Sequence, residues 1–147
     1  MINPEILREY DIRGIFNKSL KLEDIIQISE KISQILKNDK SNEIIIGHDG
    51  RTSSVEIKNT LIRNFLKYGI SVTDISLVPT PISYFANKRY KIPNLIMITG
   101  SHNPKEYNGL KIIINNKPFF GINIKSLNKI KIEELKKSSG KIFFKDP

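Results

Sequence analysis

ITGSHNPKEYNGLK, residues 98–111, is the stretch that decides how this chain folds. It follows the apolar run Leu95–Ile98, which predicts a buried strand, and it leads into Leu110–Ile114, which predicts a second strand. The break between the two runs has the composition of a turn. Because ligands collect beyond the carboxyl ends of parallel strands in α/β domains, we expect chemistry at this turn. Ser101 and His102 are its first candidate residues.

The rest of the chain alternates between the apolar periods of strands and of helices. Strands are predicted over residues 9–16, 43–47, 70–78, 95–99 and 110–114, and helices over residues 22–37, 53–69, 80–88 and 122–137. This order predicts an α/β sandwich with a largely parallel sheet, in which the strand after residue 109 is antiparallel.

Local signals set the expected ends of some elements. Ser53 and Glu56 have the spacing of a capping box, and Thr80 before Pro81 is typical of a helix N-cap. The last seven residues, KIFFKDP, are too apolar for a free tail and predict the beginning of a strand. We therefore expect the chain to be a fragment of a longer protein.

The composition indicates one globular domain. A length of 147 residues leaves room for one compact core, and the apolar (39%) and charged (27%) fractions exclude a disordered or fibrous chain. No apolar run is long enough to span a bilayer and no leader sequence is recognisable, so we expect a cytoplasmic protein with no membrane partner. The lack of cysteine excludes disulfides and thiolate metal sites.

A formal net charge of +9 is compatible with nucleic acid, anionic membranes or small phosphorylated ligands. The lysines are spread along the chain and are not interleaved with aromatic residues as in single-stranded nucleic acid binders. We therefore expect no nucleic acid partner. A lysine-rich surface without a specific ligand explains the charge better than a polyanion site does.

Three polar segments fall at predicted strand or turn ends: YDIRG (10–14), GHDGR (47–51) and TGSHNP (99–104). Their convergence would make a site, but a serine hydroxyl is a poor nucleophile without a base, a phosphate donor or a metal. Taken alone, Ser101 can equally be a turn or cap residue, and His102 a structural histidine.

Common catalytic templates are missing from the sequence. There is no GxSxG elbow, no Walker loop and no GxGxxG motif, which excludes the α/β-hydrolase reading and the usual nucleotide sites. His48, His102 and Asp49 could form a metal site only if two separate loops met in space.

The segments YDIRG, GHDGRTSS and TGSHNPKEYNGLK, in this order, resemble the first domain of the α-D-phosphohexomutase family, in particular its bacterial phosphomannomutase/phosphoglucomutase branch. The resemblance covers almost the whole chain. It implies a three-layer α/β/α sandwich with a mixed, mostly parallel sheet. It also implies that residues 1–137 form domain I and that residues 138–147 begin a linker or strand towards a second domain.

The resemblance further implies an activity and a catalytic set. The full enzyme would interconvert hexose 1-phosphate and hexose 6-phosphate, of mannose and/or glucose, through a phosphoserine and a hexose 1,6-bisphosphate intermediate. Ser101 matches the phosphoserine and Lys111 the lysine that neutralises charge and assists proton transfer. His102 is implied as a residue that lines the site and helps move a proton.

Substrate and cofactor contacts are implied in the same way. Tyr10, Arg13 and Asn103 match substrate-binding positions, and Arg13 suits a bidentate phosphate contact. One Mg²⁺ ion would bind through the phosphate on Ser101, with its other ligands in a second domain, and hexose 1,6-bisphosphate would serve as activator. The partners are then a hexose phosphate and the remaining domains, and the fragment alone is expected to be inactive.

Neighbouring positions are expected to support this loop. We interpret Asp49 and Arg51 as supports of the Ser101 loop rather than as ligands, and Gly100 as the residue that allows a tight turn. The alternative to the enzyme is a non-catalytic α/β module that binds sugar phosphates or other polyanions.

Overall fold

Helices and strands alternate along the chain up to residue 98, as the sequence predicts. The computed structural model describes residues 1–133 and 135–147. The helices are α1 (Leu22–Asn38), α2 (Ser54–Lys67), α3 (Thr80–Arg89) and α4 (Ile122–Lys125), with 3-10 turns η1 (Pro4–Ile6) and η2 (Leu127–Lys129). The strands are β1 (Ile12–Ile15), β2 (Glu43–His48), β3 (Ser71–Leu77), β4 (Leu95–Ile98), β5 (Tyr107–Ile114), β6 (Lys117–Pro118) and β7 (Ile142–Phe144). Over the described ranges, no helix has the length and apolar character needed to cross a bilayer.

The strands form one mixed sheet in the order β1-β5-β4-β2-β3-β7, with β6 paired to β5. β2 is parallel to β3 and β4, and β3 is parallel to β7. β5 is antiparallel to β1, β4 and β6, so among the strands described here it alone runs against the others. The predicted antiparallel strand is therefore confirmed, although it begins at Tyr107.

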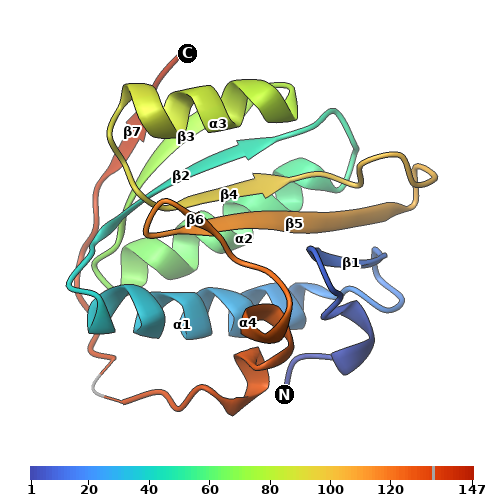
Figure 1. The fold of residues 1–147 in the computed structure, drawn as a ribbon, viewed down its shortest axis with the longest axis horizontal. Helices are drawn as coiled ribbons and strands as arrows, with labels where there is room; N and C mark the ends of the chain where they lie inside the picture. The colour runs from blue at the N-terminus through green and yellow to red at the C-terminus, as the bar shows by residue number, and fades with distance from the viewer. Residues whose placement is uncertain (134) are drawn as a thin grey trace.

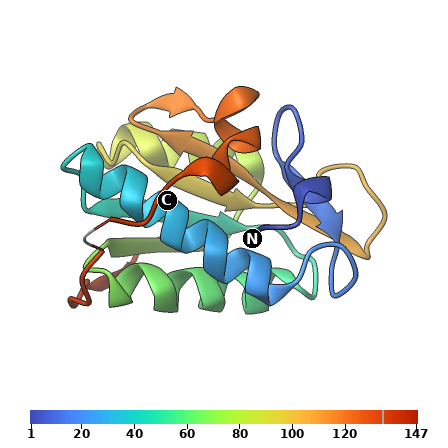
Figure 2. The ribbon, with the colours of Figure 1, turned by 90° about the horizontal axis from the view of Figure 1, so that it is seen from below.

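Helices cover both faces of the sheet, which confirms the three-layer α/β/α sandwich (Figure 1). α1 and α2 lie next to each other on one face, as Figure 2 shows, and α3 lies on the other. Ile25, Ile28 and Ile32 of α1 are fully buried because their spacing places them on one side of the helix. α3 packs over β2 and β4, while Lys111 and Ile113 of β5, on the same face, stay partly exposed.

The helix predicted over residues 122–137 is wrong. Only α4 and the turn η2 are helical there, and residue 134 lies outside the described residues. The segment is held by side chains of α1 instead: Lys31 Nζ donates to the carbonyl of Ile130, and the N–H of Glu133 donates to Gln34 Oε1 at 2.7 Å. These bonds satisfy backbone groups that a helix would have paired internally.

Two predicted helix starts also differ from the structure. Ser53 is the N-cap residue of α2, but its side chain makes no cap bond, because Ser53 Oγ instead accepts from Asn108 Nδ2 at 2.8 Å. The capping box with Glu56 is therefore absent. α3 begins at Thr80 itself, and Pro79 precedes it as the cap residue.

Both chain ends join the sheet in part. β1 is shorter than the predicted strand over residues 9–16, because the N–H of Arg8 bonds the carbonyl of Asp11 at 3.1 Å and turns the chain. The predicted C-terminal strand is confirmed as β7, whose Ile142 pairs with Val72 of β3. The boundary between residues 137 and 138 stays a prediction.

Candidate active site

The three polar segments meet at one end of the sheet. His48 ends β2 and pairs with Ile98, which ends β4, so the loops after both strands leave the sheet together. On the other side of β4, β5 pairs with β1 and sets Arg13 opposite Gly109. The predicted convergence of YDIRG, GHDGR and TGSHNP is therefore confirmed (Figure 1).

Ser101 stands at the turn that follows β4. Its backbone has a φ of 55°, in the left-handed region, and its residue surface is partly exposed. The hydroxyl Oγ accepts from Arg13 Nη2 at 3.3 Å. The N–H of Ser101 donates to Thr99 Oγ1 at 3.0 Å. The structure thus presents the hydroxyl to a guanidinium group and holds the backbone separately.

Arg13 faces this turn from β1. Its Nη1 donates to the side-chain oxygen of Asn103 at 2.7 Å, and its Nη2 also pairs with the carboxylate of Asp11. Its Nε is buried and has no hydrogen-bond partner among the described residues. Arg13, Ser101 and Asn103 are therefore brought together as predicted, and the Nε donor of Arg13 is unused.

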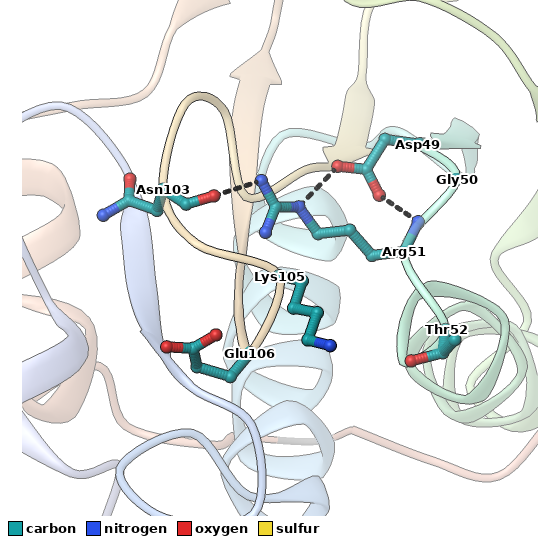
Figure 3. Close-up of a pocket in the computed structure, with 7 residues that line it drawn as sticks. All are labelled: Asp49, Gly50, Arg51, Thr52, Asn103, Lys105 and Glu106. Atoms are coloured by element: carbon teal, nitrogen blue, oxygen red, sulfur yellow. Dashed lines mark hydrogen bonds and ion pairs between the residues drawn. The ribbon is translucent and has the colours of Figure 1, made fainter.

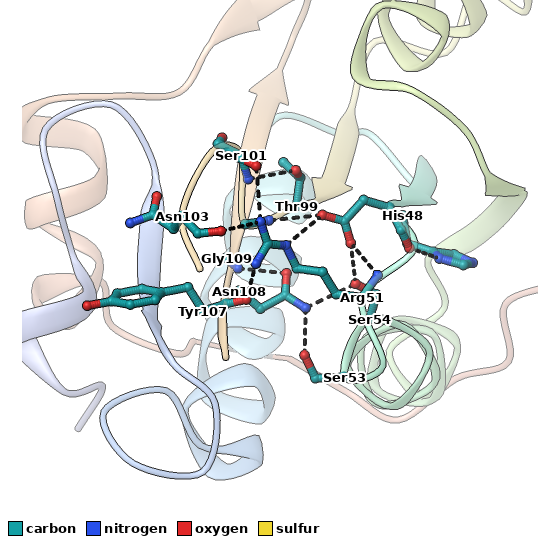
Figure 4. A network of polar contacts seen from close by, with 12 residues as sticks. His48, Arg51, Ser53, Ser54, Thr99, Ser101, Asn103, Tyr107, Asn108 and Gly109 are labelled. Carbon is teal, nitrogen blue, oxygen red and sulfur yellow. Dashed lines mark hydrogen bonds and ion pairs between the residues drawn. The ribbon is translucent and has the colours of Figure 1, made fainter. Parts of the chain in front are cut away.

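The Arg51 side chain lies at the centre of the hydrogen bonds that hold the Ser101 turn (Figures 3 and 4). Its two terminal nitrogens donate to four backbone carbonyls of the Ser101 turn, and its Nε donates to Asp49 Oδ2 at 3.1 Å. The four acceptors are the carbonyls of Ser101 (3.0 Å), Asn103 (2.9 Å), Pro104 (2.6 Å) and Tyr107 (3.1 Å). The interpretation of Arg51 as a support of the loop agrees with this geometry.

Gly100 is needed for a different reason than the one expected. Its φ is not in the left-handed region, and the tight turn falls on Ser101 instead. A β-carbon at position 100 would lie 2.2 Å from Arg51 Cζ. Glycine therefore makes room for the guanidinium group beneath the loop.

Asp49 holds the base of the same turn. Its carboxylate accepts from the N–H of Gly100 (3.1 Å), the N–H of Arg51 (3.1 Å) and the hydroxyl of Ser54 (2.6 Å). Burial would raise the pKa of Asp49, but hydrogen bonds from Ser54, the backbone of Arg51 and Gly100, and Thr99 together lower this pKa below 3.8. Asp49 is thus an ionised support rather than a proton donor.

Asn108 extends this network into the core, and sequence reasoning missed it. The residue is fully buried, and its Nδ2 donates to Ser53 Oγ (2.8 Å) and Ser54 Oγ (3.0 Å). Its Oδ1 accepts from the N–H of Gly109 at 2.9 Å. Figure 4 shows Asn108 linking β5 to the start of α2. The available signal was an asparagine two residues before the apolar run Leu110–Ile114, because an asparagine drawn into a buried strand requires buried partners.

Lys111 and Tyr10 line the same hollow, which lies between α3, β5 and the segment that follows β5. The hollow has a volume of ≈ 470 Å³, and Tyr84 and Lys88 of α3 form another part of its lining. Tyr10 is highly exposed and stacks on Phe120, with ring centroids 6.4 Å apart. Among the described residues no hydrogen bond joins Lys111 to Ser101, so the predicted proximity of the two is not a direct contact.

The two histidines do not meet. His102 is exposed and no hydrogen bond to its side chain is seen in the described part of the chain, whereas His48 is buried and its Nδ1 lies 2.8 Å from the carbonyl oxygen of Asp49. Within residues 1–133 and 135–147, no three His, Cys, Asp or Glu side chains are grouped so that they could hold a metal ion.

A second hollow, of ≈ 670 Å³, lies on the Arg51 side of the turn. Loop residues 49–52 line one part of it, and Asn103, Lys105 and Glu106 line another (Figure 3). The GHDGR and TGSHNP segments therefore both border this hollow.

Comparison with known proteins links this geometry to one family. The family model for phosphoglucomutase/phosphomannomutase, alpha/beta/alpha domain I, matches residues 4–140. A phosphomannomutase/phosphoglucomutase of Pseudomonas syringae pv. tomato is 38% identical over 139 residues, which are 93% of this chain and 30% of the relative. A phosphoglucomutase of Neisseria meningitidis serogroup B is 37% identical over 123 residues, 84% of this chain and 27% of the relative.

A solved structure agrees in fold. A phosphoglucomutase/phosphomannomutase family protein from Burkholderia thailandensis superimposes with a TM-score of 0.89 at 30% identity, covering 99% of this chain and 34% of that chain. The chain spans between 22% and 30% of the length of the curated relatives it matches.

Proposed function

Because this chain belongs to the phosphoglucomutase/phosphomannomutase family as its α/β/α domain I, we propose that it carries the phosphoserine of an enzyme that interconverts hexose 1-phosphates and hexose 6-phosphates. Mannose and glucose phosphates are the proposed substrates. The names of the relatives support a phosphohexomutase, and Ser101 is the residue that we assign to the transferred phosphate.

The observation that carries the proposal is the pairing of Ser101 with Arg13. The hydroxyl Oγ lies 3.3 Å from Arg13 Nη2, and Arg13 Nε has no partner among the described residues. A phosphate on Oγ would offer oxygens to both nitrogens, and two parallel bonds are the arrangement that arginine favours with phosphate. Asn103 holds the guanidinium group in this orientation.

The proposed reaction consists of two phosphoryl transfers, one from Ser101 to the sugar and one from the sugar back to Ser101. A hydroxyl of the hexose phosphate attacks phosphorus on Ser101, so the Oγ–P bond breaks and a sugar O–P bond forms. The sugar proton passes to a base, and Ser101 Oγ takes up a proton as it leaves phosphorus. The resulting hexose 1,6-bisphosphate turns over, and Ser101 Oγ then takes the other phosphoryl group while its proton returns to the sugar oxygen. Positioning and charge neutralisation supply most of the catalysis in such transfers.

Lys111 and His102 are the residues that we propose for these proton transfers. Lys111 shares its hollow with Tyr10, and the volume of ≈ 470 Å³ is large enough to hold part of a hexose phosphate. The lysine would also neutralise charge on the transferring group. His102 is exposed beside Ser101 and so is accessible to a bound sugar hydroxyl.

A metal ion would add to this charge neutralisation. Mg²⁺, held through an oxygen of the phosphate on Ser101, would draw charge from the transferring group. Asp11 and Asp49 are already bonded to Arg13 and Arg51. We therefore propose that the other ligands come from outside residues 1–147.

Intact-mass spectrometry of the native full-length protein tests the assignment. One phosphate is expected, mapping to Ser101, and Ser101→Ala should remove both this phosphate and the mutase turnover. The matched control is Ser139→Ala, at an exposed position away from the turn, which should keep both. A phosphate on another residue, or turnover by Ser101→Ala, would contradict the proposal. Residues 1–147 alone are expected to show no turnover.

A further inference from the structure

Ser101 has a strained backbone. Its φ of 55° places a residue with a β-carbon in the left-handed region, where that carbon crowds the following carbonyl. Such conformations persist only where the surroundings hold them, and they gather at functional sites. What holds Ser101 therefore also determines where its hydroxyl points.

Thr99 holds the N-terminal side of Ser101. Its own N–H donates to the carbonyl of Gly109 at 3.0 Å, so Thr99 is tied to β5. Its hydroxyl accepts the N–H of Ser101 at 3.0 Å, two residues along the chain. Bonds of this kind replace a backbone turn, and Thr99 as a whole residue is 5% exposed.

Arg51 holds the C-terminal side. Its Nη2 donates to the carbonyl of Ser101 at 3.0 Å. Both peptide groups that flank the Ser101 side chain are thus bonded in the left-handed turn. The hydroxyl Oγ takes no part in this support and is left to face Arg13.

We propose that Thr99 is a positioning residue for phosphoryl transfer, whose hydroxyl keeps Ser101 in the left-handed conformation that aims Oγ at Arg13. This inference rests on the proposed function of Ser101. Valine has almost the shape of threonine and keeps the backbone bond to Gly109. Thr99→Val removes the acceptor of the Ser101 N–H together with the hydroxyl that bonds Asp49. Loss of the acceptor favours rotation of Ser101 towards an extended backbone and shifts Oγ.

The affected step is the loading of Ser101 from a hexose 1,6-bisphosphate. In that step a sugar O–P bond breaks, the Oγ–P bond forms, and the proton of Oγ passes to the sugar oxygen. A displacement of about 1 Å of a reacting atom can slow such a step roughly a hundredfold. Because Thr99 is buried beneath the turn, substrate affinity should change little.

The test follows phosphate loading of the full-length protein by intact-mass spectrometry, with dephosphorylated enzyme and saturating glucose 1,6-bisphosphate. Thr99→Val should load Ser101 at least about tenfold more slowly, with the concentration for half-maximal loading within about threefold of wild type. Thr99→Ser, which restores the hydroxyl, should recover most of the rate. Thr73→Val is the matched control, since Thr73 is also 5% exposed but lies in β3; it should load normally.

Crystal structures of wild type and Thr99→Val supply a readout that is independent of activity. Ser101 should leave the left-handed region in the variant. Thr99→Ala tests the same hydroxyl if the valine protein folds poorly. Wild-type loading by Thr99→Val, or an unchanged Ser101 φ in its crystals, would overturn the inference. If wild-type protein takes no phosphate on Ser101, the proposed function fails, while the Ser101 φ still decides the role of Thr99.

Discussion

Arg51 uses its planar guanidinium group to gather one turn of backbone. Four carbonyls between residues 101 and 107 accept from two nitrogens of the same side chain, and Gly100 leaves the space in which that group lies. A lysine ammonium has three donors on a flexible stem and cannot reach four acceptors from one fixed fork. The shape of the Ser101 turn is therefore tied to the chemistry of arginine.

Arg51→Lys should lower the free energy of unfolding by roughly 2–4 kcal/mol, because several bonds from a charged donor to partly buried carbonyls are lost. Mutase turnover should fall further than stability alone explains. Chemical denaturation measures the first effect, and an assay well below the melting temperature measures the second. Arg63→Lys, at an exposed position of α2, is the control and should be close to neutral. Equal stability of Arg51→Lys and wild type would contradict the role of the fork.

Asp49 should make stability depend on acid pH. Its pKa is lower in the folded protein than the ordinary value of 3.8, so ionised Asp49 stabilises the fold above that pH. This contribution is lost as the pH falls below about 3.8 towards the lowered pKa. Unfolding measured between pH 5 and the acid limit should therefore show a shallower decline for Asp49→Asn than for wild type. Asp39→Asn, at an exposed helix end, should keep the wild-type slope.

At the scale of elements, the sequence predicts what depends on short-range periodicity. Ile25, Ile28 and Ile32 repeat at helical spacing, and α1 forms where that pattern lies. Ile124 and Leu127 have similar spacing and are also buried, yet the segment around them is mostly not helical, because side chains of α1 bond its backbone. In the same way, the Ser53 hydroxyl makes no cap bond to α2, because it bonds Asn108 of a strand distant in sequence. Local patterns carry no record of such long-range partners.

The residues of the candidate site also fall into those that the sequence could place and those that depend on long-range contacts. Ser101, Arg13 and Asn103 could be placed together because their segments follow or flank neighbouring strands. The hydroxyl of Thr99 and the buried amide of Asn108 could not, since their roles depend on backbone conformation and on contacts across the sheet.

The segment after β6 closes the N-terminus onto the domain through Asn128. Its side chain accepts the N–H of Ile2 and donates to the carbonyl of Ile2, both at 2.8 Å. Asn128→Ala should therefore cost about 1–3 kcal/mol of unfolding free energy, since a partly buried backbone pair is left without partners. Hydrogen exchange should accelerate at Ile2. Asn123→Ala, on the exposed side of α4, is the control, and equal exchange in the two variants would contradict this role.

At the scale of the whole molecule, the net charge of +9 is compatible both with an enzyme for sugar phosphates and with a polyanion-binding module. The two functions predict different salt dependence of ligand binding. Lys111 and Lys88 line the same hollow, and none of the described residues that line it is a carboxylate, so its field favours a small phosphorylated ligand. A duplex would instead need many phosphate contacts, and affinity built on 6–10 of these falls by about 10³–10⁵ between 50 and 200 mM salt. We expect only weak duplex binding, which disappears over this salt range.

The dissociation constant for a hexose phosphate, measured on the full-length Ser101→Ala protein, should rise by less than about tenfold over the same salt range, because few contacts are involved. Lys111→Ala should weaken binding of the hexose phosphate and leave the affinity for the duplex almost unchanged. Lys136→Ala, at an exposed position, should change neither affinity. Tight duplex binding that persists at a salt concentration where hexose phosphate binding is lost would favour the non-catalytic module.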